Sequence, residues 1–136
     1  MATRSTITAK LSNGIWKSVY CHWDGYPSHN GKILHERYNT QERVDALLEH
    51  GDMSVLGAHC DKPEGHSFND PVDDATIYYG RDRGEEGVEG KTGATFEEAF
   101  RGAEEFNYVW DGSRWTVEEL DLSEVLARED PDDICQ

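Results

Sequence analysis

The chain has 136 residues, and its 13 Lys and Arg face 28 Asp and Glu, which gives a formal net charge of −15 at pH 7. The excess is uneven, because residues 1–50 carry six cationic and five anionic side chains and residues 51–136 carry seven and twenty-three. This field excludes direct nucleic acid binding, which requires Lys and Arg to displace counterions; it favours a basic partner, with simple solubility as the alternative.

The first predicted elements form a hairpin. Residues 4–11 alternate apolar and polar side chains, residues 15–23 read as the return strand, and Asn13-Gly14 between them is a strong signal for a two-residue turn. Such a turn pairs Ile7 with Tyr20. The register then sorts the second strand into a core face with Trp16, Tyr20 and His22 and an opposite face with Val19 and Cys21.

Two helical stretches are expected after a turn-rich loop at residues 24–31. The first carries its apolar spacing at Ile33, Leu34 and Tyr38. The second is capped by Asn39 or Thr40, stops at Gly51, and buries a stripe of Val44, Leu47 and Leu48. The two stretches form either one kinked helix or two helices.

The middle of the chain reads as mostly irregular. Residues 52–74 are polar, residues 76–79 are a short strand candidate, and residues 80–93 hold five glycines, which is typical of a loop. Thr95 and Glu98 then form a capping-box pattern that starts a helix over residues 95–105. One face of this helix is marked by Phe96, Ala99, Phe100 and Ala103.

The C-terminal part predicts a second hairpin and a final helix. Residues 107–117 turn at Asp111-Gly112, and the side chains expected to face the core are Tyr108, Trp110, Trp115 and Val117. The spacing of a short helix follows in Leu120, Leu122, Val125 and Leu126, and residues 130–136 are expected to fray as an acidic tail. The order of elements predicts an α+β fold, one domain over residues 1–136, with an antiparallel sheet built from hairpins and helices packed on one face.

The sequence predicts a cytoplasmic protein that does not enter a membrane. No run of 18 apolar residues occurs, and the start of the chain shows no signal-peptide pattern. The odd number of cysteines, at Cys21, Cys60 and Cys135, favours reduced thiols.

The densest group of chemically versatile side chains lies where the second strand runs into its loop. Aromatic rings that stack on a planar group stand there beside His, Asp and Asn side chains that bind its edge. The residues of this candidate ligand pocket are His22, Trp23, Asp24, Tyr26, His29 and Asn30. The alternative is structural, with Trp23 and Tyr26 in an ordinary core and with His22 and Asp24 bracing the turn.

Two arginines stand out in the acidic half of the chain. Arg81 and Arg83 lie between glycines whose backbone N–H groups can approach an anion, and a guanidinium group matches the geometry of a phosphate. We expect both side chains to close the candidate pocket over Trp23 and to hold a phosphate. The alternative is that they pair on the surface with Asp82, Glu85 or Glu86.

The spacing of the Cys and His residues gives less support to a metal site or a catalytic site than to a ligand pocket. The ligand types of zinc occur at Cys21, His22, His59, Cys60 and His66, but the first two are neighbours on a strand and face opposite ways. We predict no metal and no cofactor. A hydrolase would use Cys21 with His22 or His29, oriented by Asp24, although a small buried thiol is favoured for the cysteine.

A third candidate surface is acidic. Carboxylates recur along residues 97–105 and residues 118–133, where solvated faces are the simple interpretation. Carboxylates spaced on a rigid surface also resemble an array of phosphates. Such a surface would let the protein occupy the basic groove of a nucleic-acid-binding enzyme.

Several motifs carry a resemblance to known proteins, namely Met1–Ile7, Tyr20–Tyr26, Ser28–Gly31, Gly51–Gly57 and Tyr79–Glu85. Together they resemble a family of small, largely uncharacterised bacteriophage accessory proteins. The resemblance implies an accessory protein acting in the cytoplasm of the infected bacterial host. Because such proteins often blunt host defences, it implies a counter-defence role by analogy.

Three functional hypotheses follow. The leading one is a non-catalytic accessory protein that sequesters a small phosphorylated or nucleotide ligand in the pocket closed by Arg81 and Arg83. The second is an acidic, nucleic-acid-mimicking inhibitor of the anti-CRISPR or anti-restriction type that binds a basic host defence protein, and the third is a small hydrolase. The expected partner is a small anionic ligand or a basic host protein, and a homo-oligomer that shares the pocket is compatible with a domain of this size.

Overall fold

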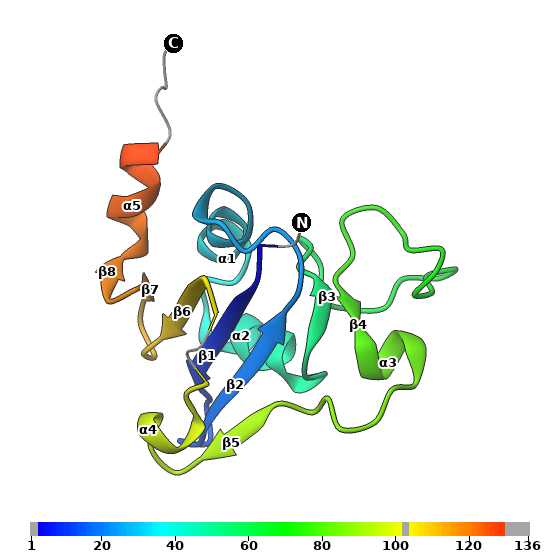
Figure 1. The fold of residues 1–136 in the computed structure, drawn as a ribbon, viewed down its shortest axis with the longest axis horizontal. Helices are drawn as coiled ribbons and strands as arrows, with labels where there is room; N and C mark the ends of the chain where they lie inside the picture. Colours follow the sequence, from blue (N-terminus) through cyan, green and yellow to red (C-terminus); the bar gives the residue numbers. More distant parts are fainter. Residues whose placement is uncertain (1–2, 102–103, 130–136) are drawn as a thin grey trace.

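The N-terminal hairpin lies at the centre of one mixed sheet (Figure 1). The fold is given by a computed structural model, which describes residues 3–101 and 104–129. The strands run in the order β4-β3-β2-β1-β6-β7-β8, and β5 pairs with the first half of β2. Their bounds are β1 (Ser5–Lys10), β2 (Trp16–Cys21), β3 (Met53–Val55), β4 (Ile77–Tyr78), β5 (Lys91–Gly93), β6 (Phe106–Trp110), β7 (Trp115–Val117) and β8 (Leu120–Asp121).

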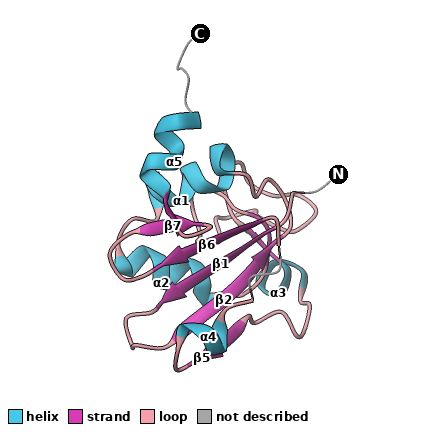
Figure 2. Ribbon diagram, turned by 60° about the vertical axis from the view of Figure 1, so that its left-hand side comes forward, coloured by secondary structure: helices cyan, strands magenta, loops and turns pink. Residues whose placement is uncertain are grey.

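Helices lie on both faces of this sheet, and α1 and α2 enclose the core. The helical segments are η1 (Pro27–Gly31, a π-helical turn), α1 (Lys32–Arg37), α2 (Gln41–Glu49), α3 (Tyr79–Arg83), α4 (Phe96–Ala99) and α5 (Leu122–Glu129). The fully buried core joins the helices to the central strands through Leu34, Val44, Leu47, Leu48, Ile7, Ala9 and Val19. Figure 2 shows α2 and α4 on opposite sides of the sheet. On the α4 side, Phe96 meets Trp16 edge to face with 5.4 Å between the ring centroids.

The predicted α+β class is confirmed, and the sheet is mostly antiparallel. Two neighbouring pairs, β1 with β6 and β2 with β3, are parallel. Parallel neighbours need a long crossover connection, and the connection between β2 and β3 carries η1, α1 and α2. Reading only the tight turns identifies the hairpins but leaves these crossovers unseen.

The predicted register of the first hairpin is wrong by one residue. Ile7 pairs with Val19, and the N–H of Leu11 donates to the carbonyl of Ile15 at 2.8 Å across a three-residue loop. Gly14 is the last residue of that loop and has φ +86°, the left-handed conformation that this loop type requires. The shift exchanges the two faces of β2, so that Val19 and Cys21 are in the core, while Trp16, Tyr20 and His22 belong to the face opposite the core.

The helix signals between residues 32 and 51 are confirmed as two separate helices. Thr40 caps α2 by accepting a hydrogen bond from the Arg43 N–H at 3.3 Å. Asn39 is therefore not the cap, and Gly51 follows the helix as predicted, with φ +82°. The predicted stripe of Val44, Leu47 and Leu48 is fully buried.

Three segments differ from the prediction in the middle of the chain. The polar segment 52–74 contains β3, and the glycine-rich segment 80–93 contains most of α3 and all of β5, because strand partners and caps decide such short elements. Thr95 and Glu98 form the predicted capping box, but α4 ends at Ala99 since Phe100 has an extended backbone with ψ 126°. Ala103 lies outside the described residues.

The second hairpin is confirmed, with Trp110 paired to Trp115 and with its four predicted core residues buried. Leu120 belongs to β8 and is half exposed, so that the final helix begins at Leu122. The predicted tail, residues 130–136, lies outside the described residues. None of the helices described in residues 3–101 and 104–129 has the length and apolar character needed to cross a membrane.

Candidate functional site

Asn30 fixes the loop that follows β2, although the sequence placed it in a ligand pocket. Its side chain is fully buried. Its Nδ2 donates to the carbonyl of Trp23 at 3.3 Å and lies 3.4 Å from the Ser5 hydroxyl. Because Nδ2 is the donor, Oδ1 is the acceptor for the Nδ1–H of His29 at 2.9 Å. The polar groups of Asn30 are therefore used inside the fold.

The aromatic residues of the same loop lie on the surface. Trp23 is 41% exposed and Tyr26 is 39% exposed, so that neither is an ordinary core residue. His22 packs edge to face on Trp23, with 4.8 Å between the ring centroids, and its Nδ1 pairs with the Tyr20 hydroxyl at 2.7 Å. Asp24 has φ +58° and accepts a hydrogen bond from the Tyr26 hydroxyl at 3.3 Å. The loop presents aromatic rings outward on a hydrogen-bonded support.

Arg81 does not close a pocket over this loop. Its Nη1 donates to the carbonyl of Cys60 at 2.6 Å, its Nη2 donates to the carbonyl of Thr76 at 3.1 Å, and its Nε donates to Asp82 at 2.8 Å. The guanidinium group also lies over the Tyr78 ring, 4.7 Å from the centroid. The donors expected to hold a phosphate are thus taken by the protein itself, which contradicts the predicted closure.

Arg83 is also engaged away from the loop, in the way the alternative prediction described. It pairs with Glu85 on the surface. Its guanidinium group stacks over Phe68 at 4.5 Å and over Tyr79 at 5.0 Å. No interaction found within the described residues joins Arg81 or Arg83 to the residues from His22 to Asn30. Whether the residues from His22 to Asn30 bind a ligand stays a prediction.

The buried carboxylate of Asp82 explains why Arg81 turns inward. Asp82 accepts hydrogen bonds from the Tyr78 N–H at 2.8 Å and from Nε2 of His66 at 3.1 Å, besides those from Arg81. The N–H of Val72 donates to Nδ1 of His66 at 3.1 Å, which fixes the tautomer with the proton on Nε2. Burial alone would raise the pKa of Asp82, but the hydrogen bonds from Arg81, Tyr78 and His66 outweigh it and lower the pKa. We call Arg81, Asp82 and His66 the Asp82 cluster.

Cys21 is not an activated nucleophile. Its side chain is fully buried, and burial raises the pKa of its thiol to about 12. A thiol with this pKa stays protonated at neutral pH, whereas nucleophilic cysteines need a thiolate. This argues against a thiolate pair at Cys21, and a hydrolase that uses His22 instead stays a prediction. In the described part of the chain, no three His, Cys, Asp or Glu side chains come together as metal ligands.

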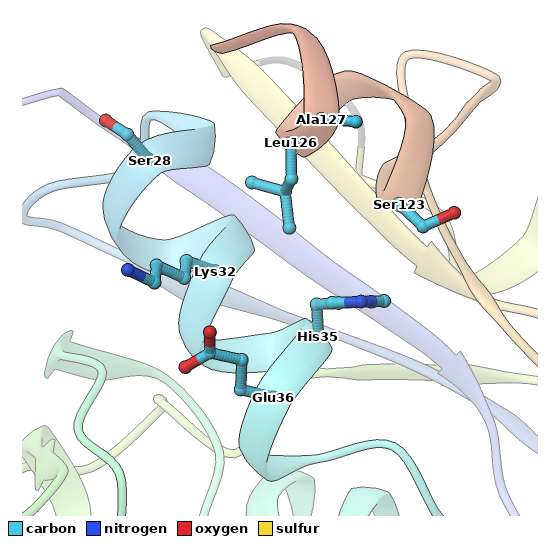
Figure 3. A pocket seen from close by; sticks show the side chains of 7 residues that line it. All are labelled: Ser28, Lys32, His35, Glu36, Ser123, Leu126 and Ala127. Carbon is cyan, nitrogen blue, oxygen red and sulfur yellow. The ribbon is translucent and has the colours of Figure 1, made fainter. Parts of the chain in front are cut away.

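Two of the hollows beside helix α1 include residues at or next to the predicted site. One, of about 400 Å³, is lined by His29 and by charged side chains of both signs, namely Lys32, Glu36, Arg37 and Asp74. The other, of about 280 Å³, lies between α1 and α5, with Leu126 pointing into it (Figure 3). Lys32 and Glu36 point to one side of it and His35 to the other, so that no set of polar groups converges on one point.

A groove on the α4 side of the sheet combines aromatic and acidic lining. It has a volume of about 520 Å³ and is lined by Trp16, Phe96, Phe100, Asn107, Val109, Thr116, Glu118 and Glu119. Phe96 and Phe100 stack with 4.7 Å between their centroids, beside Trp16. We call this feature the acidic groove, because the described residues that line it include two carboxylates and no Lys, Arg or His.

Sequence reasoning missed the acidic groove because it treated the aromatic residues as core. The signal was present in the second hairpin, where Asn107, Val109 and Thr116 alternate with the apolar core residues and so share the opposite face. Phe96 and Phe100 are four residues apart, which was read as the buried face of a longer helix. In the structure α4 ends at Ala99, and both phenylalanines line the groove.

Comparisons with known proteins leave the groove to be interpreted from its own chemistry. No family model, no curated protein and no solved structure matches the chain. The resemblance to bacteriophage accessory proteins therefore stays a prediction. What the described residues offer is a closed cluster of charges at Asp82 and an open acidic groove.

Proposed function

We propose that this chain is a non-catalytic binding protein that uses exposed carboxylates to bind a basic surface of another protein. The observation that carries the proposal is the excess of exposed carboxylates in residues 85–124, which we call the acidic surface. Its exposed carboxylate residues are Glu85, Glu86, Glu89, Glu97, Glu98, Glu105, Asp111, Glu118, Glu119 and Glu124. A surface of one sign attracts a partner of the opposite sign and speeds their association.

Few cations neutralise this surface. In the described part of residues 85–127, the exposed cationic residues are Lys91, Arg101 and Arg114. Arg101 pairs with Asp52 at 3.0 Å, and Arg114 pairs with Asp121 at 2.7 Å. Both arginines are thus engaged with carboxylates outside the list above, and of the residues in it Glu85 pairs with Arg83. Most of the exposed acidic residues therefore keep their charge available for a partner.

The nucleotide-sequestration hypothesis has less support than the acidic alternative. It needed free guanidinium groups to hold a phosphate, and those of Arg81 and Arg83 are occupied within the fold. A basic partner that normally binds nucleic acid would make the chain a competing mimic, as the second hypothesis states. The bacteriophage origin and the counter-defence role remain predictions.

Charge reversal tests the proposed function. A variant with Glu97→Lys, Glu119→Lys and Glu124→Lys changes three exposed carboxylates of the acidic surface. Proteins captured by the wild-type chain from a bacterial lysate are identified by mass spectrometry, at about 50 mM and about 500 mM salt. We expect the captured proteins to be basic, to be lost at high salt and to be absent with the variant.

A matched control variant changes the net charge by the same amount, but at residues of α1 and α2 instead of the acidic surface. Glu36→Lys, Glu42→Lys and Glu49→Lys alter exposed residues of α1 and α2 and should leave capture intact. Calorimetry with cyclic and linear nucleotides is done in parallel. Nucleotide binding that Arg81→Ala abolishes, or capture that both triple variants reduce equally, would contradict the proposal.

A further inference from the structure

The acidic groove has the dimensions and the lining of a site for a bulky apolar side chain. Its volume of about 520 Å³ lies within the range of ligand-binding pockets, about 300–1,000 Å³. Trp16, Phe96 and Phe100 are all only partly buried, so that their rings offer apolar surface to a partner. Burying such surface is the main source of affinity at protein interfaces.

The rim of the groove carries negative charge on an unfavourable backbone. Glu118 and Glu119 are the two residues between β7 and β8, where Val117 pairs with Leu120. Their φ angles are +50° and +69°. A turn of this type favours Asn and Gly, and each other residue in the left-handed region costs about 1–2 kcal/mol. The chain therefore places carboxylates here at the expense of stability.

The two carboxylates differ in how they are held. Asn107 donates from Nδ2 to both carboxylate oxygens of Glu118, each at 3.2 Å, and the Thr6 hydroxyl donates to Oδ1 of Asn107 at 2.7 Å. Glu118 is thus oriented by a chain of hydrogen bonds from the sheet. The carboxylate of Glu119 takes part in no hydrogen bond or ion pair with the described residues, which leaves it available to a cation.

We propose that the acidic groove binds a segment of a basic protein in which Lys or Arg residues flank one bulky apolar side chain. The apolar side chain enters between Trp16, Phe100 and Val109, and the flanking cations meet Glu118 and Glu119. This inference rests on the proposed function and names the site and the chemistry of its partner. A phosphate ligand or an anionic surface would be repelled by the same carboxylates. A second copy of this chain is disfavoured by the net charge of −15 that each copy carries.

Selection from a random peptide library displayed against the full-length chain tests the groove. We expect the selected peptides to combine Lys or Arg with one Leu, Phe or Trp. Thr116→Trp fills the groove without changing charge, and Thr116 is partly exposed on a strand that accepts aromatic residues. This variant should bind the selected peptides about tenfold more weakly, because the anchoring site is blocked.

Thr92→Trp is the control, since Thr92 is an exposed strand residue outside the groove lining. It should bind as the wild type does, and thermal unfolding of both variants shows whether each is folded. If basic peptides are selected but Thr116→Trp binds them normally, the groove proposal fails while the proposed function survives. If the selected peptides show no excess of Lys and Arg, both fail. A dimer in sedimentation that Thr116→Trp disrupts would replace the basic partner with a second copy.

Discussion

The Asp82 cluster and the acidic groove differ in how far their carboxylates find partners among the described residues. At the Asp82 cluster, a buried carboxylate is surrounded by donors from Arg81, Tyr78 and His66, so that its charge is spent within the fold. At the acidic groove, Glu119 has a carboxylate that finds no partner among the described residues, on a backbone that disfavours it. The comparison teaches that an unusual charged residue in a sequence points to function only when the fold leaves it unsatisfied.

The largest effect is expected from removing the buried carboxylate. Asp82→Ala removes the acceptor of the Arg81 Nε–H, the Tyr78 N–H and the His66 Nε2–H, and breaking a buried pair in this way costs about 3–5 kcal/mol. The side chain of Asp82 is 0% exposed and that of Arg81 is 13% exposed, so that solvent replaces little of the loss. Urea denaturation measures the free energy of unfolding.

The neighbouring ion pair provides the control for this substitution. Arg83 and Glu85 are 48% and 39% exposed, and exposed pairs contribute about 0–1 kcal/mol. Glu85→Ala should therefore leave the unfolding free energy almost unchanged. Equal losses in Asp82→Ala and Glu85→Ala would show that the two arginines have the same role, against the distinction drawn here.

Salt is expected to weaken binding at the acidic groove but not the contacts of the Asp82 cluster, and this effect is smaller than that of removing Asp82. Raising the salt from about 50 mM to about 500 mM is expected to weaken binding of a selected basic peptide about tenfold, because exposed charges are screened. The free energy of unfolding that Asp82→Ala costs should be about the same at both salt concentrations, since the Asp82 cluster is buried. Fluorescence anisotropy measures the peptide affinity and urea denaturation measures the free energy of unfolding, each at both salt concentrations. Peptide binding that is indifferent to salt would argue against a charged rim.

A modest gain in stability is expected at the rim. Glu119→Gly relieves the left-handed strain of about 1–2 kcal/mol but adds chain entropy to the unfolded state, for a net gain of about 0.5–1 kcal/mol. The same substitution removes a carboxylate from the groove and should weaken the binding of basic peptides. Thermal unfolding and peptide titration of one sample measure both effects. A variant that is less stable, or that binds basic peptides more tightly, would count against the assigned role of Glu119.

The smallest effect is expected from mild acid. The pKa of Asp82 is below its ordinary value of 3.8 in the fold, so its stabilising effect is complete above that value and is lost as the pH falls through the lowered pKa. Asp82→Asn removes this titration, and its stability should decline less steeply than that of the wild type below about pH 4. Urea midpoints along a pH series provide the measurement. Parallel declines in the two proteins would mean that other carboxylates govern acid unfolding.

Local signals could be predicted from the sequence, whereas choices settled by packing could not. The capping box of Thr95 and Glu98 and the alternation around Trp110 depend on near neighbours, and both are confirmed. Asn13-Gly14 fits a turn of two residues as well as a loop of three, and burial of Val19 in the core decides between them. For this reason the register was missed.

The candidate sites were harder to predict because their partners are distant in sequence. The acceptors that capture Arg81 include the carbonyl of Cys60, 21 residues away, and nothing near Arg81 in the sequence marks that contact. The acidic groove joins β2, α4, β6 and β7, four segments that only the tertiary fold brings together. The sequence shows the uneven distribution of charge, but it does not show that Trp16, Phe96 and Phe100 lie together beside the carboxylates.

The most direct test is an NMR titration of the isotope-labelled chain with a library-selected basic peptide. The indole N–H groups of Trp110 and Trp115 donate to Gln41 and to the carbonyl of Tyr38, which leaves Trp16 in the groove and Trp23 on the loop as the two reporters. We predict that the indole signal of Trp16 and the amide signals of Val109 and Thr116 shift. A shift of the Trp23 indole signal with an unchanged Trp16 would contradict the assignment of the acidic groove as the binding site.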